Sequence, residues 1–177
     1  MMTEKKDYYF SPKHPVGNFL LKWWENLENS KADRARLKRC KTLSQVEQEA
    51  AYLRVYWRLI KLFDNPPSKE QCAIIIALAA QVKENIFDPP GTKKDDQNQH
   101  FGHQMAQGSD GPKLHELRFR RLLRVQDRKR LFEVLVKIIR LMEGKVNLLD
   151  MLAVAFYWGD SARKQLAYQY YEKAKLD

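Results

Sequence analysis

The sequence is poor in cysteine and in long apolar runs, and each shortage excludes a class of protein. Only two of the 177 residues are cysteines, Cys40 and Cys72, and their spacing matches no metal or redox motif. The longest apolar runs, residues 72–80 and 151–158, fall far short of the roughly 20 residues that a membrane-spanning helix needs. The first ten residues hold no apolar stretch typical of a secretory signal. We therefore expect a cytoplasmic protein with reduced thiols and no membrane partner.

The short motifs of common enzymes are also missing. There is no glycine-rich phosphate loop, no H-E-x-x-H, no G-x-S-x-G and no paired C-x-x-C. His100 and His103 lie three residues apart with Asp95 nearby, but a zinc site needs three or four rigidly held ligands, and these residues lie in a polar, loop-like stretch. We expect solvated loop residues there and neither a metal, a cofactor nor a catalytic residue. A metal nuclease using these three residues is the enzymatic alternative.

Positive charge is what the sequence has in excess. Its 32 Lys and Arg against 22 Asp and Glu give a formal charge of +10. Residues 31–41 carry a net +5 and residues 113–145 a net +7, so the remaining 133 residues sum to −2. A balance this basic favours nucleic acid or an anionic membrane as a partner. Its concentration in two segments indicates a binding surface rather than general solubility.

Helical periodicity dominates the chain, and no run alternates convincingly with period two, so we predict an all-α fold. Capping-box patterns at Ser44/Glu47 and Ser68/Gln71 predict two helix starts. The predicted helices span residues 16–28, 31–42 (capped by Ser30), 44–63, 69–86, 114–125, 128–142 (capped by Asp127), 148–158 (capped by Asn147) and 161–175. The helix at 69–86 is apolar all round at its centre, which indicates burial.

These helices predict two small helical bundles joined by a polar loop. We assign residues 1–87 to an N-terminal bundle, 88–112 to a flexible polar loop and 113–177 to a C-terminal bundle. Residues 87–112 hold four of the seven glycines and three of the seven prolines, which is typical of a loop. Within this loop, residues 100–107 can form one helical turn.

Apolar spacing predicts which residues face the core. In the helix predicted at 44–63, one face carries Val46, Ala50, Leu53, Trp57 and Ile60. All four tryptophans occupy core-like positions, so we expect them to pack inside. Three tyrosines of the last helix cannot all face inward, and we expect one at a subunit interface: Tyr168, Tyr170 or Tyr171.

The strongest candidate for a binding surface is a row of arginines. On a helical wheel one half holds Arg118, Arg120, Arg121, Arg124 and Arg128, and the opposite half holds Phe119, Leu122 and Leu123. Arginine suits phosphate because its planar fork donates two parallel hydrogen bonds. The next helix adds a narrow stripe of Arg130, Lys137 and Arg140 with Glu133. The alternative is an ordinary solvated face whose long stems cover the core.

Several strings of the second half resemble the small subunit of the type I-E CRISPR surveillance complex, the CasB family of Cascade. The resemblance is carried by LRFRRLLRVQDRKRLFEVLVKIIRL, VNLLDMLAVAFYWG, RKQLAYQYY and FGHQMA, and more loosely by FLLKWWENL, LKRCK and AYLRVYWRLIKLF. It spans the chain from about residue 16 to residue 171. The segment 88–99 carries no such signal.

The resemblance implies a non-enzymatic, all-helical subunit that holds CRISPR RNA and target DNA through backbone contacts, beside other Cascade subunits and a second copy packed head to tail. It carries over basic positions onto Arg39, Arg124, Lys137 and Arg163, and less certainly onto Lys69. Asp160 departs from the family, since a basic residue would suit that corner. With the charge pattern, the candidate nucleic-acid-binding residues are Lys38, Arg39, Lys41, Lys69, Arg118, Arg121, Arg124, Arg128, Lys137 and Arg163.

A free-standing helix-turn-helix regulator is the alternative binding function. The helices predicted at 114–125 and 128–142 would form the pair. The second is apolar nearly all round, which leaves no face free for base edges in a major groove.

Overall fold

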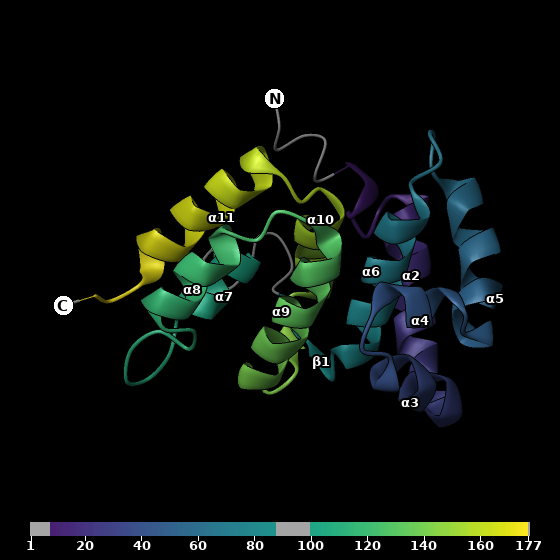
Figure 1. Ribbon diagram of the computed structural model, residues 1–177, viewed down its shortest axis with the longest axis horizontal. Helices are drawn as coiled ribbons and strands as arrows, with labels where there is room; N and C mark the ends of the chain where they lie inside the picture. The colour runs from purple at the N-terminus through teal and green to yellow at the C-terminus, as the bar shows by residue number, and fades with distance from the viewer. Residues whose placement is uncertain (1–7, 88–99, 177) are drawn as a thin grey trace.

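The computed structural model describes residues 8–87 and 100–176, and these residues form an all-α fold (Figure 1). The first half contains α2 (Pro15–Asn26), η1 (Leu27–Asn29), α3 (Lys31–Arg39), α4 (Leu43–Glu47), α5 (Ala50–Leu59), η2 (Ile60–Leu62) and α6 (Lys69–Gln81), followed by strand β1 (Glu84–Asn85). The second half contains α7 (Phe101–Ala106), α8 (Glu116–Leu123), α9 (Arg128–Leu141), strand β2 (Lys145–Val146), α10 (Leu148–Phe156) and α11 (Asp160–Lys173). The predicted fold class is confirmed.

Helix α6 lies at the centre of the molecule. Every residue from Cys72 to Gln81 is buried, as its apolar composition predicts. Its start has the predicted capping box, in which Ser68 and Gln71 satisfy each other's backbone N–H groups. The helix packs against α3, α4 and α5 of the first half and also against α9 and α10 of the second (Figure 1). It therefore joins the two halves into one core.

A small polar junction follows α6. The chain leaves the helix at Val82, earlier than predicted, and β1 pairs in parallel with β2, matching Glu84 with Lys145 and Asn85 with Val146. The turn before β2 needs a glycine, because Gly144 has φ +74° and a side chain there would meet Lys83. The junction thus holds the end of α9 against the end of α6.

Helix α7 corrects the predicted extent of the polar loop. Residues 101–106 form the helical turn that the sequence allows, but all six are buried, so this part of the assignment of 88–112 to a flexible polar loop is wrong. Gln104 accepts a hydrogen bond from the Asn147 backbone (2.7 Å) and donates one to the Ile86 carbonyl (3.1 Å). A side chain at Gly102 would lie 2.6 Å from Cβ of Gln169, so only glycine allows α7 to approach α11 this closely.

One predicted helix start is confirmed without its capping bond, and another differs from the structure. Helix α3 begins at Lys31 with Ser30 at the N-cap, as predicted, but the Ser30 side chain forms no capping hydrogen bond. Thr42, not Ser44, caps the next helix by accepting from the Gln45 backbone (3.2 Å), and a break at Gln48–Glu49 separates α4 from α5. The predicted caps at Asp127 and Asn147 are confirmed by bonds to the backbones of residues 130 and 150.

The face of α5 that packs inside is not the predicted one. Tyr52, Val55 and Leu59 are buried, whereas Leu53 is 43% exposed and Trp57 61% exposed. The prediction that all four tryptophans pack inside is therefore wrong for Trp57.

Among the tyrosines of α11, Tyr170 is buried and Tyr168 is 81% exposed. Within residues 8–87 and 100–176, no helix has both the length and the apolar character needed to cross a bilayer.

Candidate nucleic-acid interface

Helix α8 is held to the protein by one face only. Phe119 is fully buried and stacks on Tyr170 of α11, with ring centres 3.8 Å apart. The Tyr170 hydroxyl donates to the Leu114 carbonyl (2.5 Å), and the Tyr171 hydroxyl donates to the Glu116 carboxylate (2.9 Å). Burial raises the pKa of Tyr170 to about 12, so this hydroxyl keeps its proton. These contacts fix the helix and turn its opposite face outward.

The outward face carries the predicted arginines. Arg118, Arg121 and Arg124 are exposed, and none of them forms an ion pair within the residues that the structure describes. Arg120 is exposed as well, but its charge acts on Tyr171, which places it beside the Tyr171–Glu116 pair. Three guanidiniums on α8 and at its C-cap, without carboxylate partners among the described residues, remain available to an external anion.

Arg128 does not belong to this row. Helix α8 ends at Leu123, and Arg128 begins α9 after a turn, so one helical wheel does not describe both. Its guanidinium donates from Nε to the Ala155 carbonyl (3.3 Å) and from Nη2 to the Phe156 carbonyl (2.6 Å). Burial lowers the pKa of Arg128, with the Glu70 charge opposing that shift. Arg128 therefore caps the C-terminus of α10, where a cation is favoured.

Arg163 also has partners inside the fold. Its guanidinium donates to the Val125 carbonyl (3.0 Å), pairs with Asp160 and lies over the Trp158 ring, 5.8 Å from its centre. Trp158 donates to the same Val125 carbonyl (2.8 Å). Asp160, the acidic departure noted in the sequence, is thus the ion-pair partner of Arg163, and together these side chains anchor the link between α8 and α9.

Helix α9 adds a stripe of cations to the surface. Its opposite face is buried through Leu131, Phe132, Leu135, Ile138 and Ile139, against α6 and α10. Arg130 forms an ion pair with Glu133 (2.7 Å). Three exposed cations have no ion-pair partner within the described residues: Lys129, Lys137 and Arg140. Lys137 and Arg140 belong to the stripe predicted from the sequence, whereas Lys129 is an exposed cation that the sequence analysis did not select.

The first basic segment lies on α3 and the turn after it. Leu37 points into the core, while Lys38, Arg39 and Lys41 are exposed. Arg34 instead pairs with Glu28 (2.7 Å), and Asp33 pairs with Arg54 of α5 (2.8 Å). Lys69, exposed at the first turn of α6, stands apart from both basic segments in sequence.

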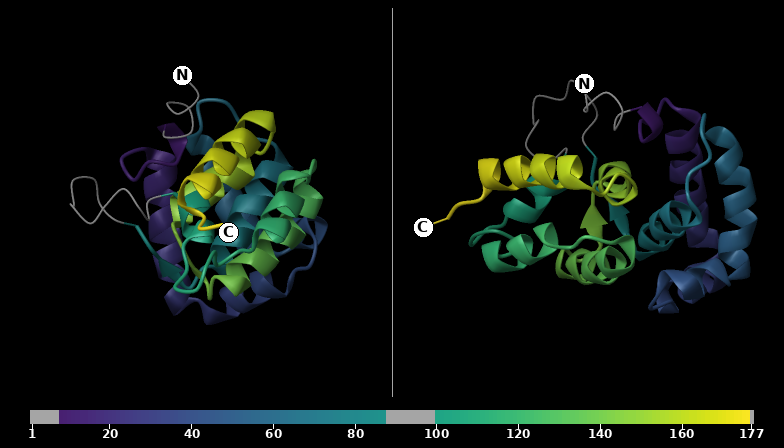
Figure 2. Two further views of the ribbon diagram at one scale, coloured as in Figure 1. Left: turned by 90° about the vertical axis from the view of Figure 1, so that its left-hand side faces the viewer. Right: turned by 45° about the horizontal axis from the view of Figure 1, so that its top comes forward.

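The two basic segments lie along one side of the molecule. In the right-hand view of Figure 2, α8, α9 and α3 follow one another along the lower edge. We call nine of the exposed cations on these helices, or directly after their C-terminal ends, the basic surface: Arg118, Arg121, Arg124, Lys129, Lys137, Arg140, Lys38, Arg39 and Lys41. Eight of the ten sequence-predicted site residues are exposed, and seven of those eight belong to this surface; Arg128 and Arg163 serve the fold, and Lys69 lies on α6.

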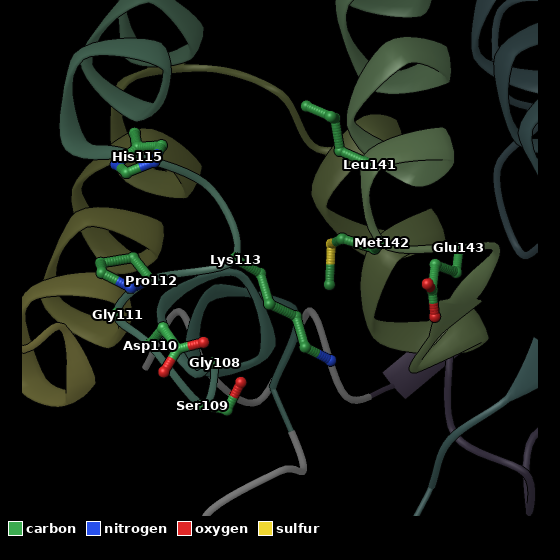
Figure 3. Close-up of a pocket in the computed structure, with 10 residues that line it drawn as sticks. All are labelled: Gly108, Ser109, Asp110, Gly111, Pro112, Lys113, His115, Leu141, Met142 and Glu143. Carbon is green, nitrogen blue, oxygen red and sulfur yellow. The ribbon is translucent and has the colours of Figure 1, made fainter.

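A cleft of about 320 Å³ opens between the start of α8 and the end of α9 (Figure 3). Lys113 extends into it, and His115, Leu141 and Met142 line it. The carboxylates of Asp110 and Glu143 also line the cleft and offset the charge of Lys113. It therefore offers a phosphate less positive potential than the arginine row beside it.

The two histidines considered as ligands contact carboxylates on different helices. His100 lies 3.4 Å from Asp150 of α10, and His103 lies 3.0 Å from Glu172 of α11. The hydrogen bond from His103 lowers the pKa of Glu172. Among the described residues, no three His, Cys, Asp or Glu side chains are grouped to hold a metal; Asp95 lies outside those residues.

Comparison with known proteins identifies the family. The family model of CRISPR-associated protein Cse2 matches residues 33–171, from α3 to α11. The chain belongs to the Cse2 family. Cse2, also called CasB, is the small structural subunit of the type I-E Cascade, so the protein has a role in CRISPR surveillance beside other subunits of that complex. No curated protein and no solved structure matches the chain.

Proposed function

We propose that this Cse2-family protein is a non-catalytic subunit that stabilises the assembly of guide RNA and target DNA, including the displaced strand, through its basic surface. The observation that carries the proposal is the row of Arg118, Arg121 and Arg124 along α8, whose other face packs against α11. All three are exposed and have no ion-pair partner in the part of the chain that the structure describes. Unpaired arginines favour phosphate, and α9 and α3 extend the positive charge along the same side of the molecule.

The proposed contacts carry no sequence information. Phosphate contacts position a protein on a strand, whereas base edges specify sequence. In guided complexes, pairing with the guide RNA reads the sequence and the protein holds the backbone. A surface of exposed arginine and lysine suits a subunit that holds the backbone and leaves sequence to the guide RNA.

The isolated protein tests this directly. We expect weak binding of single- and double-stranded DNA, with equal affinity for a given sequence and its scrambled version, in a fluorescence anisotropy titration. A strong preference for one sequence would instead favour the helix-turn-helix regulator. Cleavage of labelled DNA in the presence of a divalent metal would favour an enzyme.

A second copy packed head to tail is part of the proposal. Its support is Tyr168, which is 81% exposed on α11, at the end of the molecule opposite α5 (Figure 1). Large exposed aromatic side chains are enriched at protein interfaces. We expect Tyr168→Ala to weaken self-association in sedimentation velocity while changing stability by less than about 0.5 kcal/mol. Unchanged self-association would remove Tyr168 from the contact.

A further inference from the structure

A groove runs between α2 and α5 at the end of the molecule away from α8. The two helices lie side by side there in Figures 1 and 2. The groove has a volume of about 540 Å³, and its apolar lining comes from Phe19, Trp23 and Leu62, all half-buried. A second, smaller hollow shares Trp23, Asn26 and Arg58 with it and extends it along α5.

Both edges of this groove are basic. Lys22 of α2 is exposed and forms no ion pair within the described residues, while Arg58 of α5 lies over the Phe19 ring, 5.2 Å from its centre. Arg54 extends the α5 edge and contacts Asp33 (2.8 Å), the one acidic residue among those that line the two hollows. The groove therefore combines an apolar floor with positive charge on both sides.

Helix α5 shows further apolar surface beyond its basic edge. Its buried face is satisfied by Tyr52, Val55 and Leu59, yet Leu53 and Trp57 lie one turn apart on the outside, 43% and 61% exposed. The described residues leave them uncovered. Exposed apolar area next to a charged edge marks an interaction surface, and tryptophan is enriched among residues that dominate binding energy.

We propose that the α2–α5 groove binds an acidic amphipathic helix of a protein partner. Apolar residues one turn apart on such a helix fill a groove of this kind, and its flanking carboxylates meet Lys22 on one edge and Arg58 on the other. A single strand also stacks its bases on aromatic rings, but it needs a track of cations for its phosphates, and the residues that line this groove supply two, Lys22 and Arg58, against nine on the basic surface. Oligodeoxythymidylate binding at the groove is therefore one outcome of the test below. This proposal does not depend on the nucleic-acid function of the basic surface.

A designed peptide tests the groove in the full-length protein. The probe is a fluorescein-labelled helix of about 18 residues with leucine at i, i+3, i+4 and i+7 and glutamate on the flanking positions. We expect saturable binding by the wild type and at least a tenfold loss in Lys22→Glu/Arg58→Glu. The matched control is Lys13→Glu/Lys61→Glu, which makes the same charge change at two exposed residues outside the groove lining and should leave affinity within about twofold.

Reversing the charges sharpens the test. A peptide with lysine in place of glutamate should fail to bind the wild type and should bind the Lys22→Glu/Arg58→Glu variant. Circular dichroism and thermal unfolding establish that the variants are folded. If the double variant unfolds, Lys22→Glu alone decides, since it breaks no ion pair among the described residues, and it must weaken the acidic peptide severalfold.

Four results would overturn the proposal. The first is that the acidic peptide fails to bind at concentrations up to about 1 mM, and the second is that it binds equally well with serine in place of leucine. The third is that the Lys22→Glu/Arg58→Glu variant loses oligodeoxythymidylate binding rather than peptide binding. The fourth is that this variant loses self-association, which would assign the groove to a second copy.

Discussion

Replacing Arg118, Arg121 and Arg124 by glutamine separates phosphate binding from folding. All three side chains are exposed and have no ion-pair partner in the described part of the chain, so their loss should change stability by less than about 0.5 kcal/mol each. The same change should weaken DNA binding alike for every sequence, because contacts to phosphate do not distinguish bases.

The size of the effect follows from counterion release. Each phosphate contact contributes about 0.9 to the slope of log K against log salt for duplex DNA, and about 0.7 for single strands. If all three arginines touch phosphate, the triple variant should lose about 2.7 from the duplex slope and about 2.1 from the single-strand slope. Arg128 is excluded from the variant because its guanidinium binds the α10 carbonyls.

Fluorescence anisotropy at four salt concentrations measures both slopes. The control is Lys13→Gln/Lys22→Gln/Lys61→Gln, which removes the same charge from exposed residues outside the basic surface. We expect the control to lower affinity slightly, through net charge, with little change in slope. Equal slopes for the triple arginine variant and the wild type would refute direct phosphate contact and leave α8 as a solvated face.

Three further predictions concern the framework of the site. Arg128→Gln should destabilise the protein by roughly 2 kcal/mol in urea unfolding, since charged hydrogen bonds to two carbonyls are lost; an unchanged midpoint would contradict its capping role. Phe119→Ala should cost about 3–5 kcal/mol, because a fully buried ring stacked on Tyr170 is removed, while the salt slope of the folded fraction stays that of the wild type. Burial raises the pKa of the Cys72 thiol from 9.0 to about 12, so folding favours the neutral thiol; this stabilisation should be full below pH 9 and decline above it, and Cys72 should react with a disulfide reagent at pH 8 only after unfolding.

Local signals in the sequence predict much of this fold. The side chains of Ser68, Asp127 and Asn147 act within their own helix turn, so the sequence nearby is sufficient to place these caps. The burial of α6 follows from its all-round apolar composition. The arginine row on α8 follows equally from helical spacing against Phe119 and Leu122.

The errors arise where tertiary contacts decide. Helix α5 is apolar on two faces, and only packing against its neighbours selects the one with Tyr52 and Val55. The polar stretch around α7 is buried because Gln104 finds backbone partners from two distant segments, which spacing does not show. The sequence predicts Arg128 and Arg163 as surface cations. Their guanidiniums instead donate to the backbone carbonyls of Phe156 and Val125, which are distant in sequence. The sequence alone does not show which cations form hydrogen bonds inside the fold and which remain free on the surface.

The most direct test of the basic surface is site-specific crosslinking in the assembled complex. A photoreactive phenylalanine derivative replaces Arg121 on α8 or, as the control, Lys61 beyond α5, and the guide-loaded complex is irradiated with labelled target DNA. We predict a DNA adduct from position 121 and none from position 61, because only α8 belongs to the proposed path of the nucleic acid. An intact complex that forms no adduct at position 121, or equal adducts at both positions, would contradict the proposed function.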